Sequence, residues 1–478
     1  MTRFARITVF AAVLLAVPCR GISGSPGGIA KALGLDDGPT HTEDAIVKGR
    51  ALGDATPRPF ALGLLSSALR FPPPEFESGY RFPEQTPLPA ARPVLHEYAD
   101  VALLVVALFL ASYLILTRRN RRAIFALMIF ALCYFGFWRD GCICPVGAIQ
   151  NVTLTAFDSS YAIPLVAAGF FVIPLVFTLF CGRVFCGAVC PLGAIQDAVL
   201  IHPVRVPRWL ESGLRLLAYT YLGAGVLFAA IGSAFLICRY DPFVEFFRMT
   251  GNWNILILGV SLLVIGLFVG RPYCRFLCPY GVILRHLSRL SKRRVTITPT
   301  ECINCRLCED ACPFGAIREP TEDWPEGEYK IAKKRLVLFL VLLPVLVAAG
   351  GWGGYALKER LARMHPRVRT AERVFLEEAG QVTGTTNASD AFRTTGQASE
   401  TLYKEAMEIR NQFAIGGALL GAFVGFVAGG KLVALSVRRR RTDYEADPAG
   451  CFACGRCYKY CPKEHERRKR IEEAVAGR

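Results

Sequence analysis

The chain has 478 residues, of which 53% are hydrophobic and 20% are charged. A soluble protein has about 25% charged residues; here the apolar residues gather in runs long enough to cross a bilayer, which excludes a purely soluble protein. The net charge of +17 does not indicate nucleic-acid binding, because the basic residues lie mainly at the ends of the apolar runs. The 18 cysteines are mostly clustered, which favours metal ligation over disulfides.

The N-terminus is predicted to be a signal peptide. A basic start, Met-Thr-Arg-Phe-Ala-Arg, precedes an apolar run over residues 7–17 that is too short to span a membrane. We assign residues 1–23 to the signal peptide, with an uncleaved anchor as the alternative. Residues 24–98 are rich in Pro and Gly and show no sustained period, so they are expected to form an irregular extracytoplasmic segment.

Seven apolar runs predict a mainly α-helical, multi-span transmembrane bundle, since a spanning helix needs about 20 apolar residues. Basic residues follow the first, fifth and seventh runs and precede the fourth, which places these ends in the cytoplasm. The signal peptide independently places the mature N-terminus outside. We therefore expect a multi-pass protein of the bacterial cytoplasmic membrane, with its N-terminus outside and its C-terminus inside. The predicted spans are about 99–117, 123–138, 160–180, 213–237, 254–270, 335–356 and 411–436.

These spans divide the chain into further predicted regions. Residues 99–294 form the transmembrane core, and residues 335–436 form two more spans joined by an extracytoplasmic loop, 357–410. Within that loop a Thr-Gly-Thr-Thr sequence at 383–386 is similar to the threonine motif that carries covalent FMN in some electron-transport subunits. The loop is too short for that domain.

The strongest motif occurs twice. Residues 302–313 read Cys-x2-Cys-x2-Cys-x3-Cys-Pro, and residues 451–462 repeat this spacing. This is the bacterial ferredoxin run, in which tight turns bring three thiolates onto one [4Fe–4S] cluster. One run could instead bind zinc, but two runs with the same Cys-Pro ending favour clusters. The predicted ligands of these two clusters are Cys302, Cys305, Cys308, Cys312, Cys451, Cys454, Cys457 and Cys461.

We expect the two runs to form one cytoplasmic ferredoxin-like module, split between residues 295–320 and 445–465. Its halves belong to the regions 295–334 and 437–478. In two-cluster ferredoxins the fourth Cys of a run ligates the other cluster; if the halves do not pair, each run keeps its own fourth Cys. The expected sets are Cys302, Cys305 and Cys308 with Cys461, and Cys451, Cys454 and Cys457 with Cys312.

A weaker pattern, Cys-x3-Cys-Pro, occurs in the transmembrane core at 186–191 and 274–279, and a shortened copy, Cys-x-Cys-Pro, occurs at 142–145. Proline suits the first position of a helix, and a thiolate there faces the positive helix end, which favours metal binding or redox exchange. The alternative is that these cysteines are small buried residues that only close a helix turn. Cys133, inside the second predicted span, is expected to be an ordinary buried side chain without a metal. The predicted inner metal site is Cys186, Cys190, Cys274 and Cys278, and the predicted outer set, on the opposite face, is Cys142, Cys144 and Cys238.

With these motifs together, the chain resembles the NapH/NosR family of membrane-bound polyferredoxin-type 4Fe–4S proteins over roughly residues 99–317 and 451–462. The resemblance implies electron transfer between the quinone pool or cytoplasmic donors and periplasmic reductases. It maps the membrane pairs onto Cys186, Cys190, Cys274 and Cys278. NosR-type members carry a periplasmic FMN domain, for which residues 24–98 are too short, and here two spans separate the ferredoxin runs.

The sequence thus predicts an electron-transfer component of a membrane oxidoreductase system, with two [4Fe–4S] clusters and an additional iron–sulfur or metal site in the membrane region. Its expected partners are membrane lipid, quinone, and redox proteins on both faces, including a flavin- or haem-carrying subunit, with no nucleic acid. The alternative is an assembly or maturation factor that reduces a metal or thiol for a partner enzyme. A third hypothesis, a redox sensor, would call for an output domain.

Overall fold

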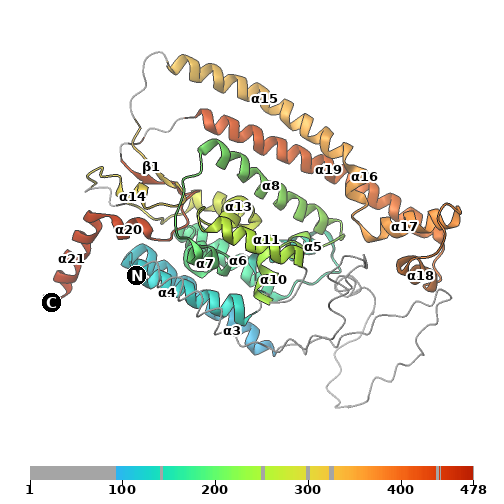
Figure 1. Ribbon diagram of the computed structural model, residues 1–478, viewed down its shortest axis with the longest axis horizontal. Coiled ribbons are helices and arrows are strands. Elements are labelled where there is room, and N and C mark those ends of the chain that lie inside the picture. Colours follow the sequence, from blue (N-terminus) through green and yellow to red (C-terminus); the bar gives the residue numbers. More distant parts are fainter. Residues whose placement is uncertain are drawn as a thin grey trace.

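The computed structural model describes residues 93–139, 141, 144–248, 253–297, 302–321, 328–437, 441 and 443–476. The predicted signal peptide, nearly all of the predicted N-terminal segment, and Cys142 lie outside these residues. The described chain is mainly helical, with one two-stranded sheet (Figure 1).

Five of the described helices are long and apolar enough to cross a membrane, and a sixth span results if the pair α10–α11, bent by 105°, is counted as one. A shorter apolar helix, α6, coincides with the remaining predicted span. Each predicted span therefore falls on an apolar helix of a multi-pass bundle. The five are α3 (Val94–Ser112) with η3 (Tyr113–Arg118), α4 (Arg121–Ala131) with η4 (Leu132–Trp138), α8 (Arg208–Ala230), α15 (Glu328–Ala356) and α19 (Ser399–Ser436); the others are α6 (Leu165–Cys181), α10 (Pro242–Arg248) and α11 (Trp253–Gly266).

Three helix boundaries differ from the prediction for identifiable reasons. Helix α6 starts at Leu165 instead of residue 160, directly after Pro164 at its N-cap. Helix α8 ends at Ala230 because the chain turns at Gly232, whose φ of 69° is in the left-handed region; the short α9 (Leu236–Arg239) follows. Helix α19 starts at Ser399, twelve residues before the predicted span, because its polar first turns pack against α17.

Short helices fill the core between the spans and start as the Cys-Pro motifs predict. Cys144, Cys190 and Cys278 are the N-cap residues of α5, α7 and α13, each followed by proline at the first helical position. The thiols are thereby placed at helix starts inside the bundle. These short elements are α5 (Pro145–Phe157), η5 (Phe185–Val189), α7 (Pro191–Val199), α12 (Pro272–Phe276), α13 (Pro279–Leu287) and η6 (Ser288–Leu290).

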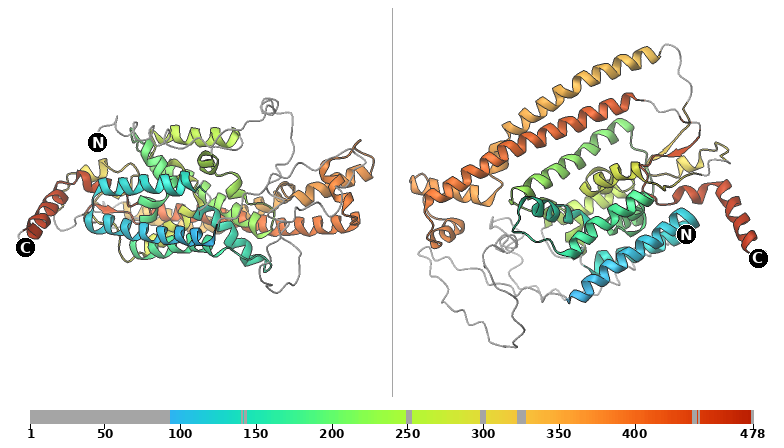
Figure 2. Two further views of the ribbon diagram at one scale, coloured as in Figure 1. Left: turned by 90° about the horizontal axis from the view of Figure 1, so that it is seen from below. Right: turned by 180° about the vertical axis from the view of Figure 1, so that it is seen from behind.

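The two ferredoxin halves meet at one end of the long helices (Figures 1 and 2). Strand β1 (Ile317–Arg318) pairs antiparallel with β2 (Glu445–Ala446), so that Ile317 lies opposite Ala446. The same end holds α14 (Leu307–Asp310), α20 (Arg456–Tyr460) and α21 (Pro462–Ala476).

A close helix hairpin brings the second half back to the first. In α15 and α19 the glycines face one another: a Cβ placed on Gly354 would lie 2.0 Å from the carbonyl oxygen of Gly417, and one on Gly421 would lie 2.0 Å from that of Gly350. Small residues at such spacing let membrane helices approach to backbone contact. The hairpin carries the chain from the ferredoxin end to the far end and back.

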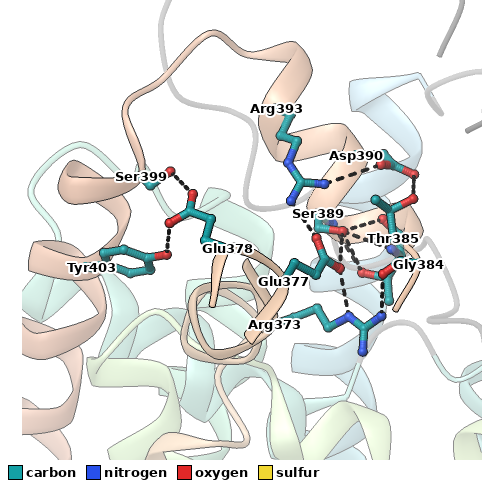
Figure 3. Close-up of polar contacts among 11 residues, drawn as sticks. Arg373, Glu377, Glu378, Gly384, Thr385, Ser389, Asp390, Arg393, Ser399 and Tyr403 are labelled. Carbon is teal, nitrogen blue, oxygen red and sulfur yellow. Dashed lines mark hydrogen bonds and ion pairs between the residues drawn. The ribbon is translucent and has the colours of Figure 1, made fainter. Parts of the chain in front are cut away.

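The far end of the hairpin is a small helical cap built from α16 (Lys358–Ala362), α17 (Pro366–Glu378), α18 (Asn387–Thr394) and the first turns of α19. Glu377 of α17 pairs with Arg373 and Arg393 at 2.8 and 2.6 Å (Figure 3). Thr386 and Ser389 form a capping box at the start of α18. The last residue of the Thr-Gly-Thr-Thr segment, Thr386, is therefore the N-cap of α18, and its hydroxyl oxygen accepts a hydrogen bond from the backbone N–H of Ser389.

Candidate iron–sulfur and thiolate sites

The first ferredoxin run shares a pocket with the last cysteine of the second run. Cys302, Cys305 and Cys308 line this pocket together with Cys461, and Cys308 lies close enough to the other three thiols for their charges to interact. The arrangement is the one expected from an exchange of fourth ligands. Among the described residues, no three His, Cys, Asp or Glu side chains could hold a single metal ion together.

The second run gathers around the last cysteine of the first. Cys312 lies within electrostatic reach of Cys451, Cys454 and Cys457. Cys312 and Cys451 also pack against one apolar group that contains Phe452. The two sets expected from the sequence are thus both assembled, each with three thiols from one run and one from the other.

The loops of the two runs have the same backbone conformation. Asn304 and Arg306 have φ of 52° and 62°, and the corresponding Ala453 and Gly455 have φ of 52° and 68°. Such left-handed φ values are uncommon outside glycine, so their recurrence marks one shared turn. A Cβ on Gly455 would lie 2.9 Å from Ile124 of α4, which shows that the second loop docks tightly on the bundle.

The inner set also converges, although its members come from four elements. Cys278 lies within electrostatic reach of Cys186, Cys190 and Cys274. Hydrogen-bond donors point at three of these sulfurs: the Gln196 amide Nε2 donates to Cys274 at 3.2 Å, the backbone N–H of Gly281 donates to Cys278 at 3.3 Å, and Arg183 donates to Cys186 at 3.8 Å. Donors around sulfur stabilise the thiolate form that binds iron. The donor set therefore fits a thiolate-ligated cluster.

Sequence reasoning missed the side chains that support this set. Gln196 also accepts a hydrogen bond from the backbone N–H of Tyr273, which ties α7 to α12. Arg271 is fully buried and donates to the carbonyl oxygen of Cys186. A usable signal was present, since a Gly-Arg pair precedes both Cys-x3-Cys-Pro motifs, at 182–183 and 270–271.

The second ferredoxin half touches the inner set directly. A Cβ on Gly187, between Cys186 and Cys190, would lie 2.7 Å from the carbonyl oxygen of Phe452. The Arg183 guanidinium lies 4.2 Å from the centre of the Phe452 ring, and that ring packs on Phe314 with 4.8 Å between centroids. One layer of side chains therefore separates the second cluster site from the inner set.

A buried carboxylate holds this junction together. Asp197 of α7, which is fully buried, pairs with Arg121 at 2.5 Å, Arg456 at 2.9 Å and Arg271 at 3.8 Å. Burial alone would raise the pKa of Asp197, but the three guanidinium groups outweigh it and hold the pKa well below its usual range. Because Arg456 belongs to α20, the clamp ties the second ferredoxin half to the transmembrane core.

The outer set is only partly described. Cys144 interacts electrostatically with Cys238, and also with Cys190 of the inner set. Cys144 therefore adjoins the inner set and does not stand at the opposite face, whereas the side chain of Cys238 is exposed. Cys142 lies outside the described residues, and its role stays a prediction. Cys133 was expected to be buried, but its side chain faces outward from η4.

Comparison with known families identifies iron–sulfur domains. A family model described as a 4Fe–4S binding domain matches residues 163–208 and 252–298, which contain the inner set. A second model with the same description matches residues 295–318, which contain the first ferredoxin run. The chain thus carries 4Fe–4S binding domains.

Three curated relatives are similar over part of the chain. YccM of Escherichia coli (strain K12), named as an electron transport protein, is 31% identical over 23% of this chain and 33% of its own. Protein NirI of Paracoccus denitrificans is 31% identical over 45% of this chain and 34% of its own length. Regulatory protein NosR of Pseudomonas aeruginosa is 30% identical over 45% of this chain and 33% of its own length. The chain therefore spans about a third of the length of these relatives. No solved structure matches it.

Proposed function

Because the chain belongs to the NapH/NosR-like family of membrane ferredoxin-type proteins, we propose that it passes electrons across the bacterial cytoplasmic membrane, between a cytoplasmic donor or the quinone pool and an extracytoplasmic acceptor. The observation that carries this proposal is the unbroken series of thiol sets. The loop with Cys305 is exposed, the loop with Cys454 is buried against the bundle, and the inner set lies behind it.

The cysteines of the two ferredoxin runs would hold two [4Fe–4S] clusters, and the inner four thiols a third, each of which exchanges one electron when bound. The residues around them serve this exchange. Arg183 and Gln196 aim donors at the inner sulfurs, while Phe314 and Phe452 exclude water from the junction. The exposed loop around Cys305 leaves the first site accessible to a soluble redox partner.

The contacts of the basic loop after η3 support a cytoplasmic position for the ferredoxin end. Arg119 pairs with the buried Glu464 at 2.9 Å, and Arg121 donates to the carbonyl oxygen of Cys454 at 2.7 Å. Loops rich in Arg stay in the cytoplasm, and these arginines contact the second ferredoxin half itself. The cap around Thr386 lies at the other end of the long helices, and we place it outside (Figure 1). Reporters fused after Arg441 and near Thr385 should accordingly read cytoplasm and periplasm.

The first test is cofactor content. Protein purified without oxygen should contain about eight iron atoms from the ferredoxin sets and about four more if the inner thiols hold a cubane. Stoichiometric zinc without iron would contradict the proposal. Low-temperature EPR of the reduced protein should show the corresponding signals.

The decisive test is transfer itself. Protein in sealed liposomes, reduced by dithionite from the ferredoxin side, should reduce ferricyanide trapped inside. Cys190→Ser and Cys278→Ser should lower this rate at least tenfold and leave the ferredoxin signals intact, whereas Cys133→Ser is the matched control because that thiol faces outward. Unchanged rates of ferricyanide reduction in both variants would show that the Cys-x3-Cys-Pro cysteines only pack at helix starts. Clusters without any transfer in the wild-type protein would favour the assembly factor.

A further inference from the structure

Four helices of the bundle start with a proline that directly follows a possible metal ligand. In three of them this residue is a cysteine, and in the fourth it is an aspartate. Cys144, Cys190 and Cys278 each stand immediately before a proline that starts a helix. Asp241 stands in the same place before Pro242, the first residue of α10. Cys274 precedes Cys278 by four residues, and Cys238 precedes Asp241 by three. The segment 238–242 therefore resembles the inner motif, with one residue fewer between its two side chains and a carboxylate in place of the second thiol.

The two copies are joined to their partner helices in the same way. Cys190 begins the sequence Cys-Pro-Leu-Gly-Ala-Ile-Gln, and Cys144 begins Cys-Pro-Val-Gly-Ala-Ile-Gln. In the inner copy, Gln196 accepts from the N–H of Tyr273 and donates to the sulfur of Cys274. In the other copy, Gln150 accepts from the N–H of Cys238 at 3.1 Å. Gln150 thus holds the Cys238 segment against α5 as Gln196 holds the Cys274 segment against α7.

The surroundings of Asp241 are those of a ligand. Its side chain is 2% exposed and lies within electrostatic reach of Cys144. Its Oδ1 accepts from the N–H of Phe243 at 3.0 Å, just as the sulfur of Cys278 accepts from Gly281, and its Oδ2 accepts from the Tyr273 hydroxyl at 3.5 Å. Among the described residues no Lys or Arg pairs with Asp241, in contrast with Asp197. A buried carboxylate is normally paired or bound to a metal.

A second group points to a ligand independently. The amide nitrogen Nε2 of Gln150 is buried and has no hydrogen-bond partner among the described residues, whereas the equivalent atom of Gln196 donates to sulfur. A Cβ on Gly147 would lie 2.9 Å from the sulfur of Cys238, so glycine is needed for this thiol to approach α5. A buried amide without a partner is costly, and a sulfur-containing group at this place would satisfy it.

We propose that Cys144, Cys238 and Asp241 ligate a further iron–sulfur cluster, in which the Asp241 carboxylate takes the place that Cys278 has in the inner set. Gln150 donates a hydrogen bond toward its sulfur. These residues lie outside the ranges that match the 4Fe–4S domains, 163–208 and 252–298. The site goes beyond the proposed function. Its test measures the amount of bound iron, a quantity that does not depend on whether the protein transfers electrons.

The experiment measures iron, acid-labile sulfide and low-temperature EPR in full-length protein purified without oxygen. Asp241→Ala, Asp241→Asn and Cys238→Ser should each lose up to about four iron atoms per chain and the same EPR signal, with the remaining signals as in wild type. Asp241→Cys should keep the iron and shift that signal, because thiolate replaces oxygen. The matched controls are Cys133→Ser and Asp158→Ala, whose side chains are exposed.

The variants also separate ligation from helix capping. Asparagine retains an oxygen that can accept from Phe243, so Asp241→Asn preserves the cap and removes the charged ligand together with the second acceptor, which binds the Tyr273 hydroxyl. Wild-type iron and EPR in both Asp241→Asn and Cys238→Ser would overturn the proposal. Wild-type iron and EPR in Cys190→Ser would contradict only a cluster in the inner set. Failure of this proposal and failure of the proposed function are therefore distinguishable.

Discussion

The two ferredoxin halves have the same motif and the same loop conformation but opposite surroundings. Residues 303–307 of the first loop are exposed, whereas residues 452–455 of the second are buried against the bundle. The cysteine spacing therefore specifies the ligands of a cluster, and burial specifies its role. An exposed site suits a partner protein that docks and delivers electrons, and a buried one suits transfer to the inner thiols.

The halves also differ in how they are attached. The second half is held by buried charges, chiefly Asp197 and the Arg119–Glu464 pair. The first half contributes an exposed pair between Arg205 and Asp310 and the packing of Phe314. Breaking a buried pair leaves an uncompensated charge, whereas an exposed pair is well solvated on its own. The following changes test this contrast.

The largest effect is expected at the buried clamp. Asp197→Ala leaves three arginines facing one another and should lower the free energy of unfolding by about 3–5 kcal/mol. Asp310→Ala is the matched control and should cost less than about 1 kcal/mol. Thermal unfolding in detergent measures both. Equal effects of the two variants would show that the second half is not held by Asp197.

A smaller effect is expected where the second loop meets the inner set. Gly187→Ala places a Cβ against the backbone of Phe452 and should cost about 1–3 kcal/mol, with a slower handover of electrons from the second site. Gly213→Ala is the matched control, because a Cβ there meets nothing within 4 Å. It should leave stability unchanged or raise it by about 0.5–1 kcal/mol. An unchanged rate in Gly187→Ala would contradict the direct contact.

Iron removal should distinguish the halves kinetically. A water-soluble iron chelator should remove about four iron atoms several-fold faster than the rest, because the loop around Cys305 is exposed. EPR during chelation should show the loss of one cluster signal first. Cys461→Ser should accelerate this phase, and simultaneous loss of both ferredoxin signals would contradict the contrast in burial.

The smallest effect concerns pH. The pKa of Asp197 is held well below the value of about 3.9 for an unfolded chain. A depressed folded pKa stabilises the protein fully above the unfolded value, and this stabilisation is lost progressively as the pH falls from the unfolded pKa through the folded pKa. The stability difference between wild type and Asp197→Asn should therefore be constant from about pH 7.5 to about pH 5.5 in thermal unfolding experiments. A difference that shrinks within this range would show that Asp197 titrates there.

The sequence alone determined the features that depend on neighbouring residues. Apolar runs predicted the helices of the bundle, and the Cys-Pro spacing predicted that Cys144, Cys190 and Cys278 start helices. These are local properties, since span length and helix starts follow from residues a few positions apart. The predicted signal peptide and Cys142 lie outside the described residues and stay predictions.

Only the tertiary structure decided which distant groups meet. It placed Cys461 beside Cys302, brought Gln196 to the sulfur of Cys274, and gathered three arginines on Asp197. The sequence reasoning did not identify Asp241 because it considered only cysteines as ligands. Asp241 corresponds to Cys278 in its position before a proline that starts a helix. Such pairings depend on how helices pack, because residues far apart in the chain are brought together by the burial of whole surfaces and not by local spacing.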